Sequence, residues 1–151
     1  PNVRFVIAGT GDMLPRIIKK TINLGINNKV SFTGWLNQKD IFKAFKMADL
    51  FVMPSVSEPF GLVALESIKN GTPVIVSKQS GVSEVLNHCL KVDFWNTNEL
   101  ADKIVSLLKH NNLYTEIKRN SEIEIQKLDM NESSLKTIEV YRNLKFLKSL
   151  L

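Results

Sequence analysis

Two glutamates, Glu58 and Glu66, flank a segment whose pattern predicts a turn from a strand into a helix. The run before it, from Leu50 to Met53, is apolar, which is typical of a buried strand. Glu58 is then expected in the loop after the strand, and Glu66 within the helix. Because open α/β sheets bind ligands beyond the carboxyl ends of their strands, both carboxylates are predicted to lie at a ligand site.

The start of this helix offers backbone donors as well. The first amides of a helix have no partner inside the helix and carry the positive end of its dipole. The amides of Phe60, Gly61 and Leu62 are expected to be of this kind. Gly61 has no Cβ, so a ligand is expected to approach the backbone closely there. A phosphate or a sugar oxygen suits such a position.

Glu66 is predicted to lie on an apolar arc of the helix, roughly 40° from Leu62 when successive residues are about 100° apart. A carboxylate on such an arc needs a partner, since burying an unpaired charge is costly. Vicinal hydroxyls, such as those of a ribose, would satisfy both of its oxygens, while Glu58 in the loop would accept hydrogen bonds from a sugar. The alternative is a surface Glu66 that pairs with Lys69.

The sequence around these glutamates resembles the retaining GT-B glycosyltransferases of family 4, the group 1 transferases, whose motif is two glutamates with seven residues between them. Four further segments match that family in order. They are residues 30–36, which border the nucleobase; 48–55, the strand into the site; 70–75, a Gly-x-Pro-Val turn; and 80–84, similar to Gly-Gly-x-x-Glu with Ser80 in place of the first glycine. The resemblance covers about residues 2–110.

The resemblance implies a nucleoside-diphosphate sugar as donor and transfer of its glycosyl group, with retention, to an acceptor. The donor-binding residues that it implies are Glu58, Phe60, Gly61, Leu62, Glu66, Trp35 and Leu36. Glu66 would hold the ribose hydroxyls, and Glu58, the one residue given a catalytic role, would hold the transferred sugar. For Trp35, half-buried packing is the alternative to contact with the base. Catalysis would rest on positioning and electrostatics, with no metal and no cofactor.

The alternation of apolar runs and helical patterns predicts an α/β fold with a Rossmann-like, doubly wound parallel sheet and two C-terminal helices. The strands are expected at 3–8, 30–33, 50–53, 74–77 and 90–92, and the main helices at 12–24, 37–47, 62–69, 81–86, 97–108, 113–127 and 135–150. The first strand is expected to be buried. Asp12 or Gly11, Asn37 and Thr97 are the predicted helix caps.

This pattern corresponds to the C-terminal, donor-binding half of a GT-B fold. The resemblance implies that residues 1–151 form a single domain, a fragment of a longer enzyme whose N-terminal domain holds the acceptor. It also implies that the first strand and helix of the donor domain are missing, together with an Arg and a Lys that neutralise the diphosphate. The isolated fragment is therefore expected to be inactive.

The composition, with 44% hydrophobic and 23% charged residues, is that of a soluble globular protein. Cys89 is the sole cysteine, which excludes an internal disulfide and favours a reducing, cytoplasmic location. The net charge of +5 is spread along the chain, which favours a solvated surface over nucleic-acid binding. It leaves open a weak peripheral contact with the anionic inner face of a membrane.

Other classes of site find less support. The segment Gly9 to Gly11 follows a strand, but a dinucleotide-binding fingerprint needs a third glycine where Leu14 stands. His88 and His110 lack partners at metal-ligand spacing. Two alternatives to a transferase stay open: a sugar-nucleotide epimerase of the same architecture, and a non-catalytic module that binds nucleotide sugars.

Overall fold

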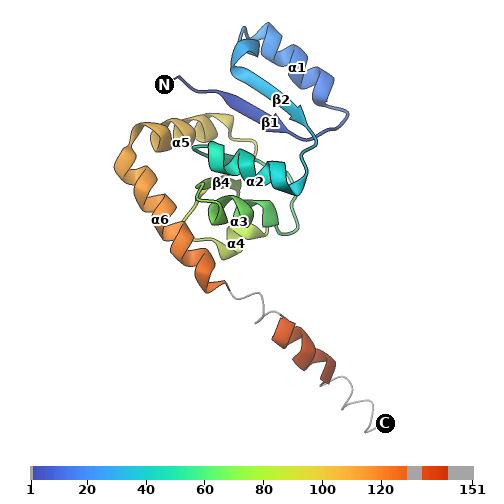
Figure 1. Ribbon diagram of the computed structural model, residues 1–151, viewed down its shortest axis with the longest axis vertical. Helices are drawn as coiled ribbons and strands as arrows, with labels where there is room; N and C mark the ends of the chain where they lie inside the picture. The colour runs from blue at the N-terminus through green and yellow to red at the C-terminus, as the bar shows by residue number, and fades with distance from the viewer. Residues whose placement is uncertain (1, 129–133, 143–151) are drawn as a thin grey trace.

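The computed structural model describes residues 2–128 and 134–142. Its elements in chain order are β1 (Phe5–Ala8), α1 (Leu14–Asn23), η1 (Asn27–Lys29), β2 (Val30–Gly34), α2 (Gln38–Met47), β3 (Phe51–Met53), α3 (Leu62–Lys69), β4 (Val74–Ser77), α4 (Val82–Val85), β5 (Leu90–Val92), α5 (Thr97–Lys109) and α6 (Asn111–Lys127) (Figure 1). Residues 134–142 are also helical, so the second C-terminal helix is confirmed there, and 143–150 lie outside the described residues. The predicted α/β alternation is confirmed.

Every described strand pairing is parallel, but the strands form two sheets rather than one. β1 pairs with β2, and β4 lies between β3 and β5. Figure 1 shows the first sheet with α1 at one end of the molecule, beyond α2, and α3 to α6 in the part that holds the second sheet. We call residues 2–34 the N-terminal layer and residues 50–128 the body.

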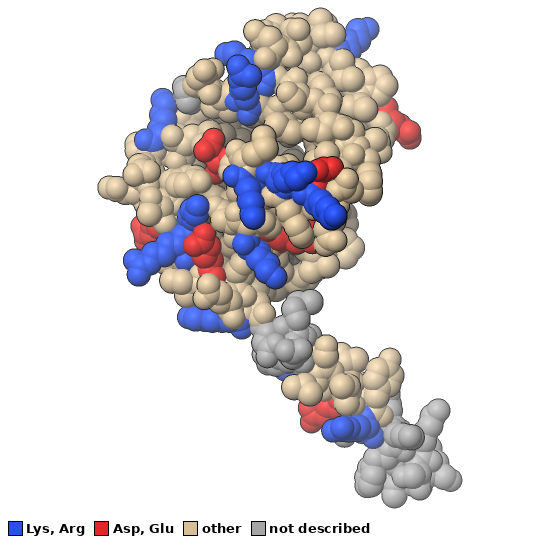
Figure 2. Space-filling view, in the orientation of Figure 1, with Lys and Arg blue, Asp and Glu red and all other residues tan. Residues whose placement is uncertain are grey.

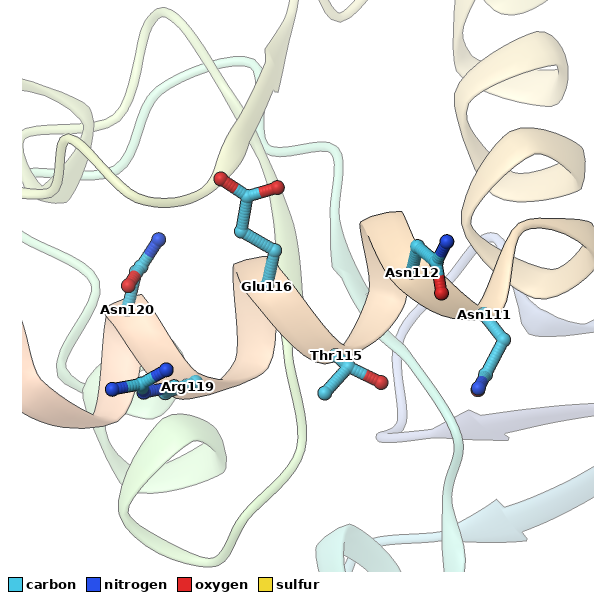
Figure 3. A pocket seen from close by; sticks show the side chains of 6 residues that line it. All are labelled: Asn111, Asn112, Thr115, Glu116, Arg119 and Asn120. Atoms are coloured by element: carbon cyan, nitrogen blue, oxygen red, sulfur yellow. The ribbon is translucent and has the colours of Figure 1, made fainter.

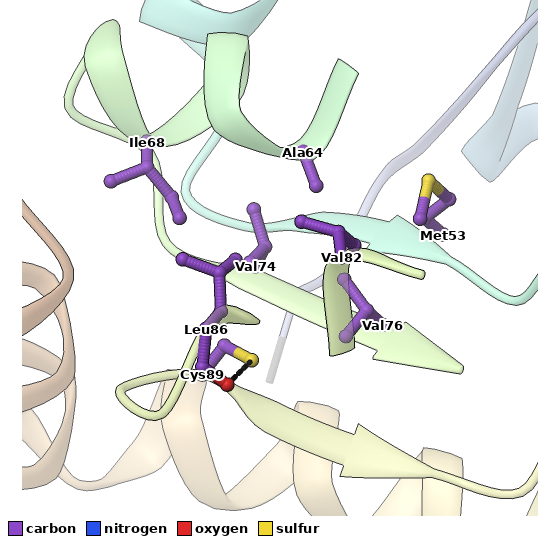
Figure 4. Packing of buried hydrophobic residues seen from close by; sticks show 8 residues of the cluster. All are labelled: Met53, Ala64, Ile68, Val74, Val76, Val82, Leu86 and Cys89. Carbon is purple, nitrogen blue, oxygen red and sulfur yellow. Dashed lines mark hydrogen bonds between the residues drawn. The ribbon is translucent and has the colours of Figure 1, made fainter. Parts of the chain in front are cut away.

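The core of the protein lies on both faces of the second sheet. Val74, Ile75 and Val76 of β4 are fully buried. Because side chains alternate along a strand, Val74 and Val76 join a cluster with α3 and α4, whereas Ile75 packs with Leu107 of α5. Figure 4 shows the first cluster, in which the strand packs against the helices above it. Burial on two faces explains why β4 is an unbroken apolar run.

β1 departs from its predicted burial. It is as apolar as β4, yet Phe5 is 45% exposed and Val6 is 63% exposed. Among residues 2–34, Thr21 alone is classed as buried. The reason is that β1 has one neighbouring strand and one covering helix, so the expectation of a buried first strand was wrong for this structure.

The helix caps follow the sequence in part. Asn37 caps α2, because its side-chain oxygen accepts a hydrogen bond from the third amide of the helix at 3.0 Å. Asn96, not Thr97, caps α5 in the same way at 3.1 Å, so that prediction was wrong by one residue. α1 begins after Met13 without a side-chain cap, which contradicts both predicted caps there.

Charged side chains of both signs lie on the face shown in Figure 2, where Asp and Glu stand among the Lys and Arg. One pair on α2, Lys43 with Asp40, has 3.1 Å between its charged atoms. Within the described ranges, none of the helices combines the length and the hydropathy needed to cross a membrane.

Candidate active site

Glu58 and Glu66 lie on one loop–helix segment at the carboxyl end of β3, as predicted. Glu58 belongs to the loop and Glu66 to the second turn of α3, and both residues are half-buried. Neither glutamate forms an ion pair with another described residue, so the alternative pairing of Glu66 with Lys69 is not found. Two half-buried carboxylates are therefore available to a ligand.

The loop that carries Glu58 is attached to the loop after β4. Glu58 and Ser80 form an isolated parallel bridge. The amide of Gly81 donates to the carbonyl oxygen of Glu58 at 3.0 Å, and the amide of Val82 donates to that of Phe60 at 2.5 Å. The backbone position of Glu58 is thus set by a neighbouring strand end as well as by its own.

Gly61 is the N-cap of α3 and has a φ of 98°, a left-handed conformation that favours glycine. A Cβ at this position would lie 2.9 Å from Cε of Met53 and 3.1 Å from Cγ1 of Val82. The sequence suggested that the missing Cβ makes room for a ligand. The structure gives a different reason for this glycine, since protein side chains fill that space.

The amides at the start of α3 are free, as expected. Those of Phe60, Gly61 and Leu62 donate no hydrogen bond to another described residue. The first bond of the helix runs from Ala64 to the carbonyl oxygen of Gly61 at 3.0 Å. Phe60 and Leu62 are exposed residues close in sequence to Glu58, whereas Gly61 between them is buried. Such a group of amides attracts an anionic or hydroxylated ligand.

Trp35 and Leu36 lie apart from this segment, at the carboxyl end of β2 in the other sheet. Trp35 is 75% exposed, so the alternative of a half-buried packing residue was wrong. Leu36 is half-buried. Their contact with a base stays a prediction, and it requires a ligand that extends from one sheet to the other.

Two of the surface hollows among the described residues lie elsewhere. One, of about 580 Å³, is lined by Asn111, Asn112, Thr115, Glu116, Arg119 and Asn120. Figure 3 shows that all six side chains come from successive turns of α6, with no second element as a wall. The other, of about 180 Å³, lies at the end of β1 and is lined by Ile7, Ala8, Gly9, Thr10, Gly11, Met13, Leu14 and Ile17. Neither hollow includes Glu58 or Glu66.

Sequence reasoning missed a polar network beside the site. The side chain of Gln79 donates to Asp93 at 3.0 Å and accepts from the amide of Phe94 at 3.3 Å. Lys78 also reaches Asp93, at 2.8 Å, and hydrogen bonds from Lys78 and Gln79 lower the pKa of the Asp93 carboxyl. No local motif marks these residues, because the contacts join the ends of two neighbouring strands, β4 and β5.

Cys89 is a buried free thiol, as predicted. Burial raises its pKa to about 11, so the thiol stays protonated near neutral pH and is a poor nucleophile. In the part of the chain that the structure describes, no three His, Cys, Asp or Glu side chains are grouped so that they could hold a metal ion.

The sequence matches the glycosyl transferases group 1 family over residues 1–123. An uncharacterized glycosyltransferase of Methanocaldococcus jannaschii is 46% identical over 87 residues, which are 58% of this chain and 22% of that protein. Mannosylfructose-phosphate synthase of Agrobacterium fabrum is 31% identical over 130 residues, which are 79% of this chain and 29% of that enzyme. The chain therefore spans less than a third of either relative.

The fold has solved counterparts. The crystal structure of Anabaena HepE in complex with UDP-glucose superposes with a TM-score of 0.82 at 24% identity, covering 95% of this chain and 42% of that one. The predicted fold, that of the Rossmann-like C-terminal half of a GT-B protein, is confirmed. With its motifs, its fold and the match over residues 1–123, the chain belongs to the glycosyl transferases group 1 family.

Proposed function

We propose that this chain is the donor-binding domain of a glycosyltransferase that moves a glycosyl group from a nucleoside-diphosphate sugar to an acceptor, with retention at the anomeric carbon. One observation carries the proposal: Glu58 and Glu66 are half-buried without ion-pair partners, on the same loop–helix segment as the free amides of Phe60, Gly61 and Leu62. The structure of HepE, a protein of similar fold, has been solved in complex with UDP-glucose, which supports a donor of this class.

Each group has a proposed role. Glu66 accepts hydrogen bonds from the two ribose hydroxyls, and Glu58 accepts them from the transferred sugar and holds it for reaction. The amides at the start of α3 stabilise the charge of the leaving diphosphate, aided by the helix dipole. Trp35 and Leu36 line the base. The leaving diphosphate assists attack by the acceptor, so the reaction needs neither a protein nucleophile nor a metal.

The acceptor is proposed to bind to an N-terminal domain outside this chain. A doubly wound sheet has the strand order 3-2-1-4-5-6. The two sheets here, β2-β1 and β3-β4-β5, fit positions 3-2 and 4-5-6 of that order. A first strand with its helix would fill the gap between β1 and β3 and join the sheets. We further propose a cytoplasmic enzyme, in peripheral contact with the inner membrane face, which transfers a hexosyl group.

Calorimetric titration of the longer enzyme with UDP-glucose and UDP tests these roles, with ADP-glucose and GDP-mannose in parallel. Glu66→Ala is expected to weaken both UDP and UDP-glucose by about 10- to 150-fold, because a lost hydrogen bond to a charged group costs about 1.5–3 kcal/mol. Glu58→Ala is expected to weaken UDP-glucose and leave UDP unchanged, since its proposed partner is the sugar.

Glu116→Ala is the matched control, because Glu116 is an exposed glutamate on α6, far along the chain from the site. Its affinity for each nucleotide is expected to equal that of the wild type. If Glu66→Ala stays within about 0.5 kcal/mol of wild type, the ribose role fails. If the wild type binds none of the three nucleotide sugars, the proposed function fails as a whole.

The reaction itself is tested in the longer enzyme, with the N-terminal domain present. We expect proton NMR of the product to show the anomeric configuration of the donor, and turnover to persist in excess EDTA. Inversion of configuration would contradict the retaining mechanism, and loss of turnover in EDTA would contradict metal independence. The 151-residue chain alone is expected to show no transfer.

A further inference from the structure

Gly81 lies against the backbone of the loop that carries Glu58. A Cβ added to Gly81 would lie 2.2 Å from the carbonyl oxygen of Pro59, 3.0 Å from its carbonyl carbon and 3.1 Å from Cα of Phe60. All three neighbours are backbone atoms, which cannot rotate away as the end of a side chain can. Any residue other than glycine at this position therefore has to displace one of the two loops.

The conformation of Gly81 does not itself call for glycine. Of the seven glycines in the chain, five have a positive φ, and only Gly11 and Gly81 do not. Gly81 has φ −58° and ψ −33°, values that every L-residue adopts readily. The close approach to Pro59 is thus what excludes a side chain.

The segment Ser77–Ser83, which we call the strap, is braced by hydrogen bonds within itself and is tied to the loop after β5. Ser80 is buried, and its hydroxyl donates to the carbonyl oxygen of Ser77 at 2.7 Å. The hydroxyl of Ser83 donates to that of Lys78 at 2.9 Å. The side chain of Gln79 is tied to the loop after β5. The strap therefore resists displacement away from the Glu58 loop.

The Glu58 loop cannot retreat inward either. A methyl group on Gly61, at its end, would lie 2.9 Å from Met53 and 3.1 Å from Val82. Figure 4 shows Met53 and Val82 as neighbours in the buried cluster of the body. A methyl group on residue 81 would thus push the loop outward, toward the surface at which its carboxylate is available.

We propose that Gly81 is a positioning residue for Glu58. Because Gly81 has no side chain, the strap packs directly against the backbone of Pro59, and this contact fixes the depth at which the Glu58 carboxylate meets the sugar of the donor. This inference rests on the proposed function, because it assigns to Glu58 the sugar-binding role given there. It adds a residue that touches no substrate and acts through the backbone of Pro59.

Gly81→Ala tests the proposal, and Gly11→Ala is its matched control. Gly11 also lacks a positive φ, and a Cβ there would meet nothing within 4 Å. We expect Gly81→Ala to raise the Kd for UDP-glucose at least tenfold and that for UDP less than threefold, at 10 °C. Simple destabilisation would weaken both ligands equally, because it lowers only the folded fraction. Gly11→Ala is expected to leave both Kd values within twofold.

Amide hydrogen exchange provides a readout without ligand. The amides of residues 81 and 82 donate to the Glu58 loop, so they are expected to be protected in the wild type and in Gly11→Ala. In Gly81→Ala their exchange is expected to be at least tenfold faster. Should Gly81→Ala not fold, Gln79→Ala loosens the strap without adding volume and is expected to raise the Kd for UDP-glucose about threefold, with UDP unchanged.

Three outcomes would overturn the inference. In the first, the wild type binds UDP-glucose and Gly81→Ala binds it equally well. In the second, UDP and UDP-glucose lose affinity by the same factor, which indicates a structural role alone. In the third, Gly81→Ala does not fold and Gln79→Ala binds UDP-glucose as the wild type does. If the wild type binds no nucleotide sugar, the proposed function fails first, and this inference fails with it.

Discussion

Two strands of similar composition, β1 in the N-terminal layer and β4 in the body, have opposite surroundings. β1 is Phe-Val-Ile-Ala and β4 is Val-Ile-Val-Ser, and each is four residues long. All four residues of β4 are buried, whereas three of the four in β1 are exposed. An apolar strand is therefore not always buried, because the elements that pack around it decide how much of it stays exposed.

β4 is buried because it has a strand on each side and helices on both faces. β1 has a strand on one side only. Its other edge is a row of unpaired backbone groups, with which another strand can form hydrogen bonds. Its exposed Phe5 and Val6 lie in the same layer as exposed Ile18 and Ile22 of α1. Because successive side chains of a strand point to opposite faces, Phe5 and Val6 show that both faces of β1 are open, and the unpaired edge is where the proposed strand between β1 and β3 would pair.

The largest difference between the two regions is expected from a matched pair of isoleucines on helices. Ile68 of α3 is 1% exposed and belongs to the body core, whereas Ile22 of α1 is 59% exposed. Ile68→Ala is expected to lower the free energy of unfolding by about 2–5 kcal/mol, because it leaves a cavity. Ile22→Ala is expected to change it by less than about 0.5 kcal/mol. Urea denaturation followed by circular dichroism measures both.

A loss of more than about 2 kcal/mol of unfolding free energy for Ile22→Ala would contradict the difference between the two regions. It would show that the N-terminal layer is covered in solution, and repeating the denaturation at several protein concentrations would reveal whether a second copy covers it. An equal, small effect of both substitutions would instead contradict the core assigned to the body.

Local patterns predicted the elements and the placement of the two glutamates. The apolar run before Glu58 and the helical pattern through Glu66 depend on neighbours in sequence, so a strand, a loop and a helix could be assigned without tertiary information. The cap at Asn37 is equally local, because an Asn followed three residues later by Asp40 satisfies a helix start by itself.

Contacts between distant segments could not be predicted in this way. The division into two sheets depends on which element lies beside β1, and the residues of β1 do not indicate that element. The reason for Gly61 depends on Met53 and Val82, which the fold brings to it. Likewise, Gln79 and Asp93 meet because β4 and β5 are neighbours, and nothing in their spacing indicates a pair.

A smaller effect is expected from a pair of threonine hydroxyls. Thr72, before β4, is 2% exposed, and its hydroxyl donates to the carbonyl oxygen of Phe45 at 2.6 Å, which ties α2 to the body. Thr72→Val removes this hydrogen bond, while the carbonyl oxygen of Phe45 keeps the one from the Ala48 amide at 3.0 Å, so the expected cost is about 0.5–1.5 kcal/mol of unfolding free energy. Thr33→Val, in β2, removes an exposed hydroxyl and is expected to cost less than about 0.5 kcal/mol.

Thermal denaturation of the two valine variants measures this difference. Val and Thr have nearly the same shape, so the comparison isolates the hydroxyl. Equal melting temperatures for the two variants would contradict the tie between α2 and the body. A larger loss for Thr33→Val would show that the long contact of its hydroxyl with Ile7, at 3.5 Å, holds the N-terminal layer together.

The smallest effect is expected from Glu124, which ties α6 to the segment before β5. Its carboxylate accepts hydrogen bonds from the amides of Asn87 and His88 at 2.8 and 2.9 Å. Burial raises the pKa of Glu124, but the hydrogen bonds from His88 and Asn87 outweigh it, so the pKa is lowered from 4.5. A lowered pKa in the folded state means that the stabilisation is complete above the unfolded value and is lost as the pH falls through the folded value.

Glu124→Gln is therefore expected to be less stable than the wild type at pH 7, by at most about 1 kcal/mol because the half-buried carboxylate is still partly screened by solvent. The difference is expected to shrink as the pH falls from about 5.5 toward 3, as the wild-type carboxylate gains its proton. Glu116→Gln, at an exposed position on the same helix, is the control and is expected to show no such trend. Urea denaturation at each pH measures the differences. A gap between Glu124→Gln and wild type that is constant with pH would show that the carboxylate charge takes no part in holding α6 to the body.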